Sequence, residues 1–190
     1  MQPPSHLVLI GPMGAGKSAL GRRLATLRDL PFVDLDREIE LRAGADIPTI
    51  FAHEGEAGFR RREREALAGA LAGPSCVLAT GGGAVLDPEN RALMRRHGFV
   101  VHLRIAVETQ LARLAGDRSR PLISGDDREA VLRRLAAERG PLYEAAADLN
   151  FESIDETPAE SAARLAAMLA DRLDAHRHRS AVPSSVPDPT

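Results

Sequence analysis

The segment that most restricts the fold is residues 6–27, where a short apolar run leads through a glycine-rich turn into a helical stretch. The run is HLVLI, the turn GPMGAGKS fits the pattern G-x-x-x-x-G-K-[ST], and KSALGRRLATL has helical spacing. A strand, a glycine-rich loop and a helix in this order direct backbone N–H groups and the positive end of the helix toward a phosphate group. The pattern therefore predicts a phosphate-binding loop.

Lys17 is the only lysine of the chain; every other long cationic side chain is an arginine. A compact ammonium group can reach phosphate oxygens from within such a loop, whereas the planar guanidinium favours a two-point contact from outside. Gly11, Gly14 and Gly16 relieve the steric limits on the loop backbone. Ser18 offers a hydroxyl to a magnesium ion that bridges the outer phosphates. The alternative is a glycine-rich turn that carries a surface lysine.

Strand-like and helical segments alternate along the rest of the chain. Five short runs indicate strands: residues 6–10, 31–35, 76–80, 99–103 and 149–153. Helical spacing is clear in residues 17–27, 61–72, 107–116, 127–140 and 158–173. Gly140 and Pro141 indicate the end of the fourth of these helices. We expect one three-layer α/β/α domain, residues 1–175, around a five-stranded parallel sheet.

Composition disfavours several classes of protein. With 25 basic and 27 acidic side chains the net charge is −2, so no overall field favours nucleic acid or an anionic membrane. No run of about 18 apolar residues predicts a membrane span. Cys76 is the single cysteine, and we expect a buried thiol in a protein of the reducing cytoplasm. Residues 176–190 are predicted to be a disordered tail, where His176 and His178 are more consistent with a solvated segment than with a metal site.

The metal ion of a phosphate site is usually held by an acidic residue, and the position where many proteins carry that residue is not acidic here. Many ATPases and GTPases carry this acid at the end of a second apolar strand, but Thr80 ends the run 76–80. A guanine-reading Asn-Lys-x-Asp element is excluded because there is no second lysine. Asp34 and Asp36 would point to one side of an extended chain, so one could hold the hydrated metal and the other the attacking hydroxyl. Alternatively, Asp36 caps the following helix and Asp34 is a solvated strand end.

Three further segments allow both a structural and a functional interpretation. Arg60 belongs to GFRRREREAL, which is either an exposed helix laced with ion pairs or one that directs one or two arginines into a cleft. The glycines at 81–83 form a plain loop or let a ligand approach bare backbone. Residues 113–127 form a surface loop or a lid that brings Arg118 or Arg120 over the phosphates.

In order, the segments GPMGAGKS, DLDREIE, GEAGFRRRE, LATGGGAV, RPLI and ERGPLYEAAAD resemble the shikimate kinase family. The resemblance covers residues 7–173, and the combination is far more selective than the phosphate loop alone. It implies a P-loop kinase fold with a mobile lid over residues 113–127. It also implies Mg²⁺-dependent transfer of a phosphoryl group from ATP to the 3-hydroxyl of shikimate, in aromatic amino-acid biosynthesis. We expect a monomer.

The resemblance implies roles for individual residues. ATP would be bound by Gly14, Ala15, Gly16, Lys17, Ser18, Ala19, Arg113 and Arg120. Magnesium would be held by Ser18 and, through water, by Asp34. Shikimate would be bound by Asp36, Arg60, Gly81, Gly82, Gly83 and Arg139, with Lys17, Asp36 and Arg120 acting in catalysis. Without the resemblance Arg139 is ambiguous, because cations are common at helix C-termini. Two departures are Ala19, where the family commonly has threonine, and residues 154–158, an adenine-contacting segment that here has no cation.

Two other functions remain open at this point. A kinase of the same fold could act on gluconate or on a nucleoside monophosphate, although an aromatic content of 3% leaves little for a base-stacking pocket. The chain could also be a nucleotide-binding regulatory module without transfer activity. The presence of Lys17, Asp36 and Arg120 argues against that interpretation.

Overall fold

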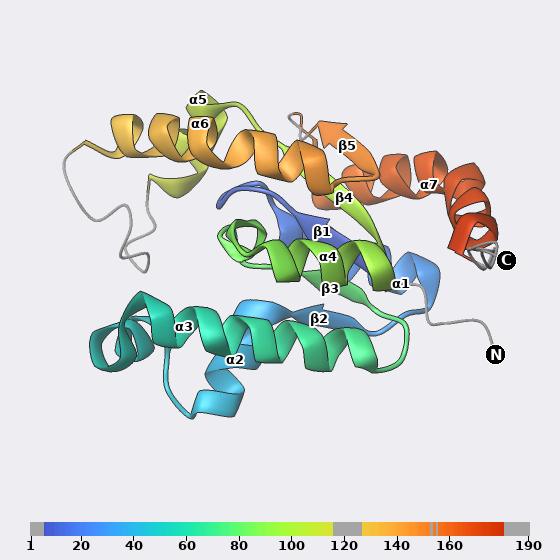
Figure 1. Ribbon diagram of the computed structural model, residues 1–190. Coiled ribbons are helices and arrows are strands. Elements are labelled where there is room, and N and C mark those ends of the chain that lie inside the picture. The colour runs from blue at the N-terminus through green and yellow to red at the C-terminus, as the bar shows by residue number, and fades with distance from the viewer. Residues whose placement is uncertain (1–5, 116–126, 153, 155, 181–190) are drawn as a thin grey trace, which may run out of the picture.

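The computed structural model describes residues 6–115, 127–152, 154 and 156–180. Five strands form one sheet in the order β2-β3-β1-β4-β5 (Figure 1), and all four pairings are parallel. The strands are β1 (His6–Ile10), β2 (Phe32–Asp34), β3 (Val77–Ala79), β4 (Gly98–Arg104) and β5 (Leu149–Glu152). The predicted five-stranded parallel sheet is therefore confirmed.

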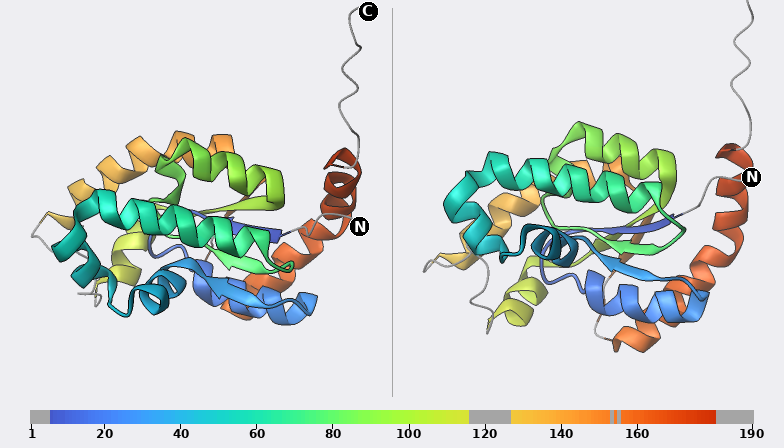
Figure 2. Two further views of the ribbon diagram at one scale, coloured as in Figure 1. Left: turned by 60° about the horizontal axis from the view of Figure 1, so that its bottom comes forward. Right: turned by 90° about the horizontal axis from the view of Figure 1, so that it is seen from below.

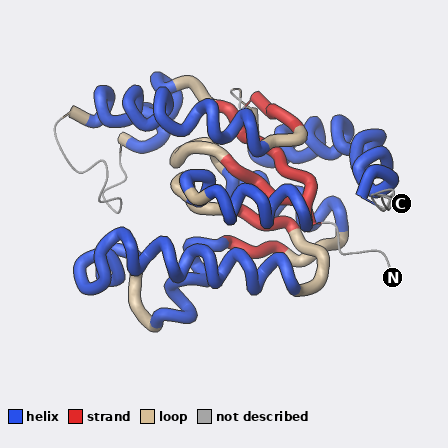
Figure 3. The backbone as a smooth tube through the Cα atoms, viewed as in Figure 1, coloured by secondary structure: helices blue, strands red, loops and turns tan. Residues whose placement is uncertain are grey.

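Helices cover both faces of the sheet. The helices α1 (Lys17–Arg28) and α7 (Pro158–Ser180) lie on one face, and α3 (Ile47–Ala72), α4 (Pro88–His97) and α6 (Arg128–Ala146) lie on the other (Figure 2). At the β2 edge of the sheet, α2 (Leu35–Ala43) packs against α3. Elsewhere, α5 (Val107–Leu114) packs against α6. A short 3₁₀ helix, η1 (Ala84–Leu86), follows β3. The strands are thus enclosed between helices (Figure 3).

Alternation along β1 divides its side chains between two cores. Leu7 and Leu9 pack with residues of α1 and α7, whereas Val8 and Ile10 pack with residues of α2, α3 and α4. All four side chains are at most 3% exposed. Full burial of each such side chain contributes about 1.5–3 kcal/mol to folding. A strand that is apolar on both faces is therefore the expected centre of this fold.

The predicted helix end at Gly140 and Pro141 is wrong, because α6 continues through both residues to Ala146. Proline removes one N–H from the helix ladder. Beyond it, however, Tyr143 and Ala146 are each 2% exposed and pack in the core. Burial of this last turn outweighs the local helix-ending signal.

The helix α3 begins earlier than the helix predicted over residues 61–72, and α4 was not predicted from the sequence. At the start of α3 the Asp46 side chain accepts a hydrogen bond of 2.9 Å from the N–H of Thr49, and at the start of α4 the Asp87 side chain accepts one of 2.8 Å from the N–H of Glu89. Both are helix caps with a proline in the first turn. The backbone of α3 breaks at Gly55, where φ is 68° and ψ is −176°.

At the C-terminal end α7 extends to Ser180, so residues 176–180 are helical instead of belonging to the expected tail. Residues 181–190 lie outside the described residues, as do residues 116–126 of the expected lid, with Arg118 and Arg120. No helix in the described part of the chain is long and apolar enough to cross a membrane. Cys76 is buried as predicted, and burial raises the pKa of its thiol to about 11.

We predict that His6 makes folding stability fall as the pH drops below 6.5. His6 is fully buried, and burial lowers its pKa from the ordinary value of 6.5, with nearby His97 adding to the effect. The unfolded chain then binds more protons, so stability is lost as the pH falls from 6.5 through the folded-state pKa. Circular-dichroism melts about one unit above and below pH 6.5 should give a lower Tm on the acid side.

The variant His6→Gln should narrow this Tm difference, because glutamine does not titrate. His53 is exposed, so His53→Gln is the matched control and should leave the difference unchanged. Equal Tm differences in the unmodified chain and in His6→Gln would contradict the assignment.

Candidate active site

The phosphate loop leaves the carboxyl end of β1 and turns into α1. Gly11, Gly14 and Gly16 have φ values of 139°, 77° and 86°, a region that other residues rarely adopt. A Cβ at Gly11 would also lie 2.5 Å from the carbonyl oxygen of Leu103. Lys17 Nζ donates to the carbonyl oxygens of Gly11 and Pro12 at 2.7 and 2.8 Å, so the ammonium group lies against its own loop.

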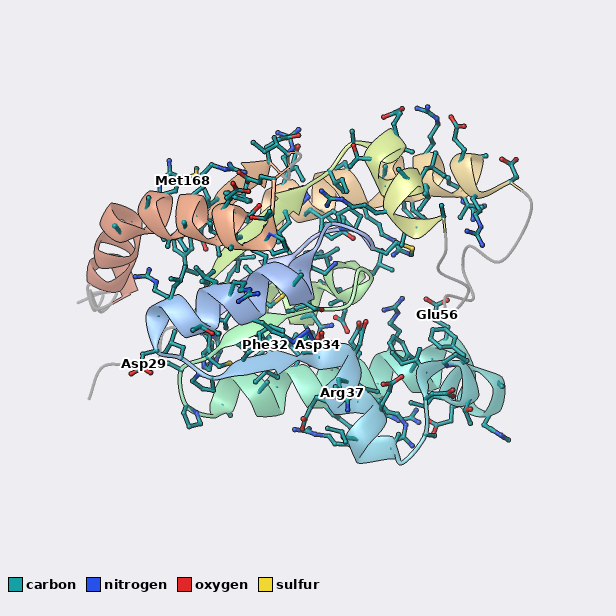
Figure 4. The ribbon with its side chains drawn as sticks, turned by 180° about the vertical axis from the view of Figure 1, so that it is seen from behind. Asp29, Phe32, Asp34, Arg37, Glu56 and Met168 are labelled. Atoms are coloured by element: carbon teal, nitrogen blue, oxygen red, sulfur yellow. The ribbon has the colours of Figure 1, made fainter. Side chains whose placement is uncertain are left out.

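Ser18 and Asp34 meet beside this loop. Ser18 Oγ donates to Asp34 Oδ2 at 2.5 Å, although Asp34 lies at the end of β2, two strands away from β1 in the sheet. Asp34 also caps α2, with Oδ1 accepting from the N–H of Arg37 at 3.4 Å. Figure 4 shows Asp34 where β2 runs into α2. The hydroxyl and the carboxylate are hard oxygen donors of the kind that Mg²⁺ prefers.

The expected parallel arrangement of Asp34 and Asp36 is wrong. Asp34 has extended backbone angles and is the helix cap, whereas Asp36 lies in the first turn of α2. Their carboxylates therefore point to different parts of the site. Asp34 contacts Ser18, and Asp36 Oδ1 lies 2.7 Å from the position that a Cβ would take at Gly81. The capping role considered for Asp36 belongs to Asp34.

The glycines after β3 are closely surrounded by charged side chains. A Cβ at Gly81 would lie 2.7 Å from Asp36 Oδ1 and 3.0 Å from Glu63 Oε1. A Cβ at Gly83 would lie 2.5 Å from Arg60 Nη1. Larger residues at these two positions would displace the charged groups. The bare backbone thus allows α2 and α3 to bring a carboxylate pair and a guanidinium to one loop.

Gly82 joins this cluster to α6 and to the phosphate loop. Its carbonyl oxygen accepts hydrogen bonds from Arg139 Nη1 at 3.3 Å and from the Tyr143 hydroxyl at 2.5 Å. A Cβ at Gly82 would lie 3.5 Å from the backbone nitrogen of Met13. Asp36, Arg60 and Arg139 therefore come from three helices to the three glycines, next to the loop that carries Lys17.

Arg60 is the member of its arginine run that reaches the site. Arg60 Nη1 donates to Glu63 Oε2 at 2.7 Å, and the Glu63 side chain is 1% exposed. Burial acts to lower the pKa of Arg60, but Glu63 and Glu56 overcome this and raise it. Burial raises the pKa of Glu63 against the opposing effect of Arg60. Arg61, by contrast, is 64% exposed, as expected for a residue on another face of the helix.

Two buried polar atoms of this cluster lack a hydrogen-bond partner among the described residues. They are Nε of Arg139, a residue only 8% exposed, and Oε1 of Glu63. A buried polar atom without a partner costs about 1–3 kcal/mol. A polar ligand with acidic and hydroxyl groups between the glycines and α6 would provide the missing partners.

A cavity of about 350 Å³ adjoins the phosphate loop and shares no lining residue with the cluster at the three glycines. It is lined by Gly14, Ala15, Gly16, Ala19, Leu20, Leu103, Arg113, Phe151, Glu156, Pro158 and Ser161. Arg113 Nη1 donates to the carbonyl oxygen of Gly14 at 3.3 Å. Residues 154–158 carry no cation, but Arg164 of α7 forms an ion pair of 2.5 Å with Glu156. The volume is at the lower end of the range for small-molecule sites.

Sequence reasoning assigned no role to several residues that shape the site. Glu63 stands three residues after Arg60, a helical spacing that could have indicated the ion pair. Tyr143 and Gln110 gave no such signal. Gln110 of α5 is 3% exposed and its Nε2 donates to the carbonyl oxygen of Met13 at 2.8 Å, which braces the phosphate loop.

Comparisons with known proteins agree with one another. A family model described as shikimate kinase matches residues 13–170. A shikimate kinase of Stenotrophomonas maltophilia (strain R551-3) is 56% identical over 170 residues, which are 90% of this chain and 94% of that protein. A shikimate kinase of Xanthomonas oryzae pv. oryzae (strain PXO99A) is 51% identical over the same shares.

Solved structures give the same result. A shikimate kinase from Acinetobacter baumannii in complex with shikimate aligns with a TM-score of 0.87 and 40% identity, covering 90% of this chain and 96% of that one. A gluconokinase from Sinorhizobium meliloti 1021 aligns over 92% of this chain and 98% of its own, with a TM-score of 0.54 and 16% identity. At that identity the likeness concerns the fold alone.

We predict that Tyr143 ionises only at strongly alkaline pH. Burial raises its pKa from 10.0 to about 12. Because the chain has one tyrosine and no tryptophan, the ultraviolet absorbance of phenolate reports on this residue alone. A rapid pH jump, faster than alkaline unfolding, should show little phenolate at pH 10.0, the ordinary pKa. The same titration in denaturant should show half ionisation there, and half ionisation at this pH in the folded chain would contradict the burial of the Tyr143 hydroxyl.

Proposed function

The chain belongs to the shikimate kinase family of ATP-dependent phosphotransferases, and on this premise we propose that it transfers the γ-phosphoryl group of ATP to the 3-hydroxyl of shikimate with Mg²⁺. The observation that carries this proposal is the convergence of Asp36, Arg60 and Arg139 on the glycines beside the phosphate loop. One carboxylate and two guanidinium groups complement an acceptor that carries hydroxyl groups and a carboxylate.

Arg60 and Arg139 are proposed to bind the shikimate carboxylate. A forked guanidinium forms two charge-assisted hydrogen bonds with a carboxylate, which fixes both position and orientation. The unpartnered Nε of Arg139 supports this role, because a carboxylate would satisfy it. Backbone atoms of Gly81, Gly82 and Gly83 can approach the ring closely because no Cβ intervenes.

Asp36 is proposed to hold the reacting hydroxyl. Its Oδ1 faces Gly81, so an acceptor bound against the glycines would present a hydroxyl to the carboxylate. A carboxylate there can orient the hydroxyl toward the γ-phosphoryl group and accept its proton during transfer. In phosphoryl transfer, positioning and charge stabilisation supply most of the rate enhancement.

The nucleotide is proposed to lie along the phosphate loop, residues 14–19, with its base in the cavity that Arg113 lines. Lys17 would exchange its two carbonyl partners for phosphate oxygens. Arg120, which lies outside the described residues, would add a charge over the phosphates. The cytoplasmic location and the monomeric state stay predictions from the sequence.

Magnesium is proposed to be held by Ser18 directly and by Asp34 through water. Their oxygens lie 2.5 Å apart beside the loop, which fits a hydrated ion that completes its shell with phosphate oxygens. When bound, the ion neutralises charge on the outer phosphates. The described residues contain no cluster of three or more His, Cys, Asp or Glu side chains that could hold a metal ion by themselves.

We predict that shikimate stimulates ADP release by this chain in the presence of ATP and Mg²⁺. The measurement is a coupled ADP-release assay with shikimate, gluconate and a nucleoside monophosphate as acceptors. Only shikimate should give turnover well above the water background, and omission of Mg²⁺ should abolish it. Turnover with gluconate alone would point to another kinase of this fold. Tight ATP binding without turnover on any acceptor would point to a regulatory module.

We predict that Arg60→Ala impairs use of shikimate much more than Arg61→Ala does. Truncating one member of a buried charge pair costs at least about 2 kcal/mol, so kcat/KM should fall at least about 30-fold, mostly through KM. Arg61 is its sequence neighbour but is 64% exposed, and Arg61→Ala should change kcat/KM less than about twofold. Equal kinetics of the two variants would refute the assigned role of Arg60.

A further inference from the structure

Arg60 is held by two carboxylates that differ sharply in exposure. Glu63 takes Nη1, and its side chain is 1% exposed. Glu56 takes the other edge of the guanidinium, with Oε1 accepting from Nη2 at 3.1 Å and from Nε at 3.3 Å, and its side chain is 65% exposed. The first ion pair is enclosed within the protein, whereas water can reach and compete with the second.

The Nε and Nη2 atoms form one of the edges through which an arginine grips a carboxylate with two parallel hydrogen bonds. A single oxygen of Glu56 occupies this edge. Among the described residues, the other carboxylate on Arg60 is Glu63, which is buried and would leave an unpaired buried charge if it moved away. An incoming carboxylate that uses this edge must therefore displace Glu56.

We propose that Glu56 is an internal competitor for the carboxylate-binding edge of Arg60, which an anionic acceptor displaces. This inference rests on the proposed function, in which Arg60 binds the carboxylate of the acceptor. Glu56 thereby sets how tightly an acid is bound. A neutral analogue gains nothing from the exchange, because it offers Arg60 no charge in place of the one that leaves.

The backbone next to Glu56 has room for such an exchange. Glu56 directly follows Gly55, where φ of 68° and ψ of −176° break α3, and apart from its chain neighbours and the local backbone of α3 no described residue has an atom within 4 Å of the position of a Cβ at Gly55. Glu56 is thus the first residue after the break and is not buried by a neighbouring element. Figure 4 shows it on the side of α3 that faces α5 and α6.

Glu56 could instead be a positioning residue that keeps Arg60 in its binding conformation, and the two roles predict opposite signs. If Glu56 competes, removing its charge strengthens binding of shikimate. If it only positions Arg60, removing the charge weakens binding. The measurement is isothermal titration of shikimate into the full-length chain without nucleotide.

For Glu56→Gln we expect the Kd of shikimate to fall about two- to fivefold, the range for one exposed ion pair. Glu56→Ala should shift the Kd in the same direction. The methyl ester of shikimate, which lacks the charge, should bind to Glu56→Gln and to the unmodified chain with the same affinity. Glu65 is an exposed residue of the same helix, so Glu65→Gln is a control for the charge change and should leave the Kd unaltered.

A higher Kd in Glu56→Gln, with a melting curve like that of the unmodified chain, would overturn the proposal. So would an equal gain in Glu65→Gln or for the methyl ester, because the effect would then not depend on exchange at Arg60. If the unmodified chain does not bind shikimate at all, the proposed function itself fails, and this inference fails with it.

Discussion

The site depends on one geometric constraint, that neighbouring parallel strands end at the same edge of the sheet. In the order β2-β3-β1 the chain leaves β2 at Asp34, β3 at the glycines 81–83 and β1 at the phosphate loop. These three exits are side by side although they are distant in the sequence. Ligands of open parallel sheets bind outside the carboxyl ends of the strands for this reason. The hydrogen bond between Ser18 and Asp34 and the close approach of Gly82 to Met13 both follow from that order.

Charge at the proposed acceptor site is held in place by the burial of one ion pair and not by the number of ion pairs. Exposed pairs such as Arg133 with Glu129 contribute little to stability. The pair of Arg60 and Glu63 is different, because Glu63 is nearly inaccessible and burial raises its pKa. Such a pair is weak as a source of stability but costly to break from one side. It therefore fixes the position of Arg60 beside Gly83. The unpartnered atoms of Arg139 and Glu63 leave hydrogen-bonding capacity for a ligand.

Local features could be predicted well from the sequence, whereas the meeting of side chains from distant segments could not. The phosphate loop and the five strands could be predicted because their signals lie within a few consecutive residues. The end of the helix at Gly140 and Pro141 was mispredicted because burial of Tyr143, which packs against distant segments, decides where α6 stops. Asp36 was expected on an extended chain because nothing local announces that Asp34 already caps a helix. Which arginine of the run faces the site depends on Gly83 and Glu63, and only the second of these has a readable spacing. The hydrogen bond from Gln110 to the phosphate loop could not be predicted, because no pattern in the neighbouring residues indicates it.

Lys17 and Arg60, two of the cations that are proposed to bind substrates, have one feature in common. In each case hydrogen-bond acceptors of the chain itself hold the cation before a ligand arrives. Lys17 is held by the carbonyl oxygens of Gly11 and Pro12, and Arg60 by the carboxylate of Glu56 on its exposed edge. Lys17 is thereby fixed near its working position, and Arg60 is fixed by the buried Glu63, so less conformational entropy remains to be lost on binding. The acceptors that hold the two cations differ in charge. In the proposed complexes a phosphate oxygen would replace the neutral carbonyl oxygens of Gly11 and Pro12 at Lys17, whereas a carboxylate would replace another carboxylate at Arg60. The exchange of carbonyl for phosphate oxygens would favour binding of the nucleotide, while the exchange at Arg60 would be nearly balanced and would reward only an acceptor that brings its own negative charge.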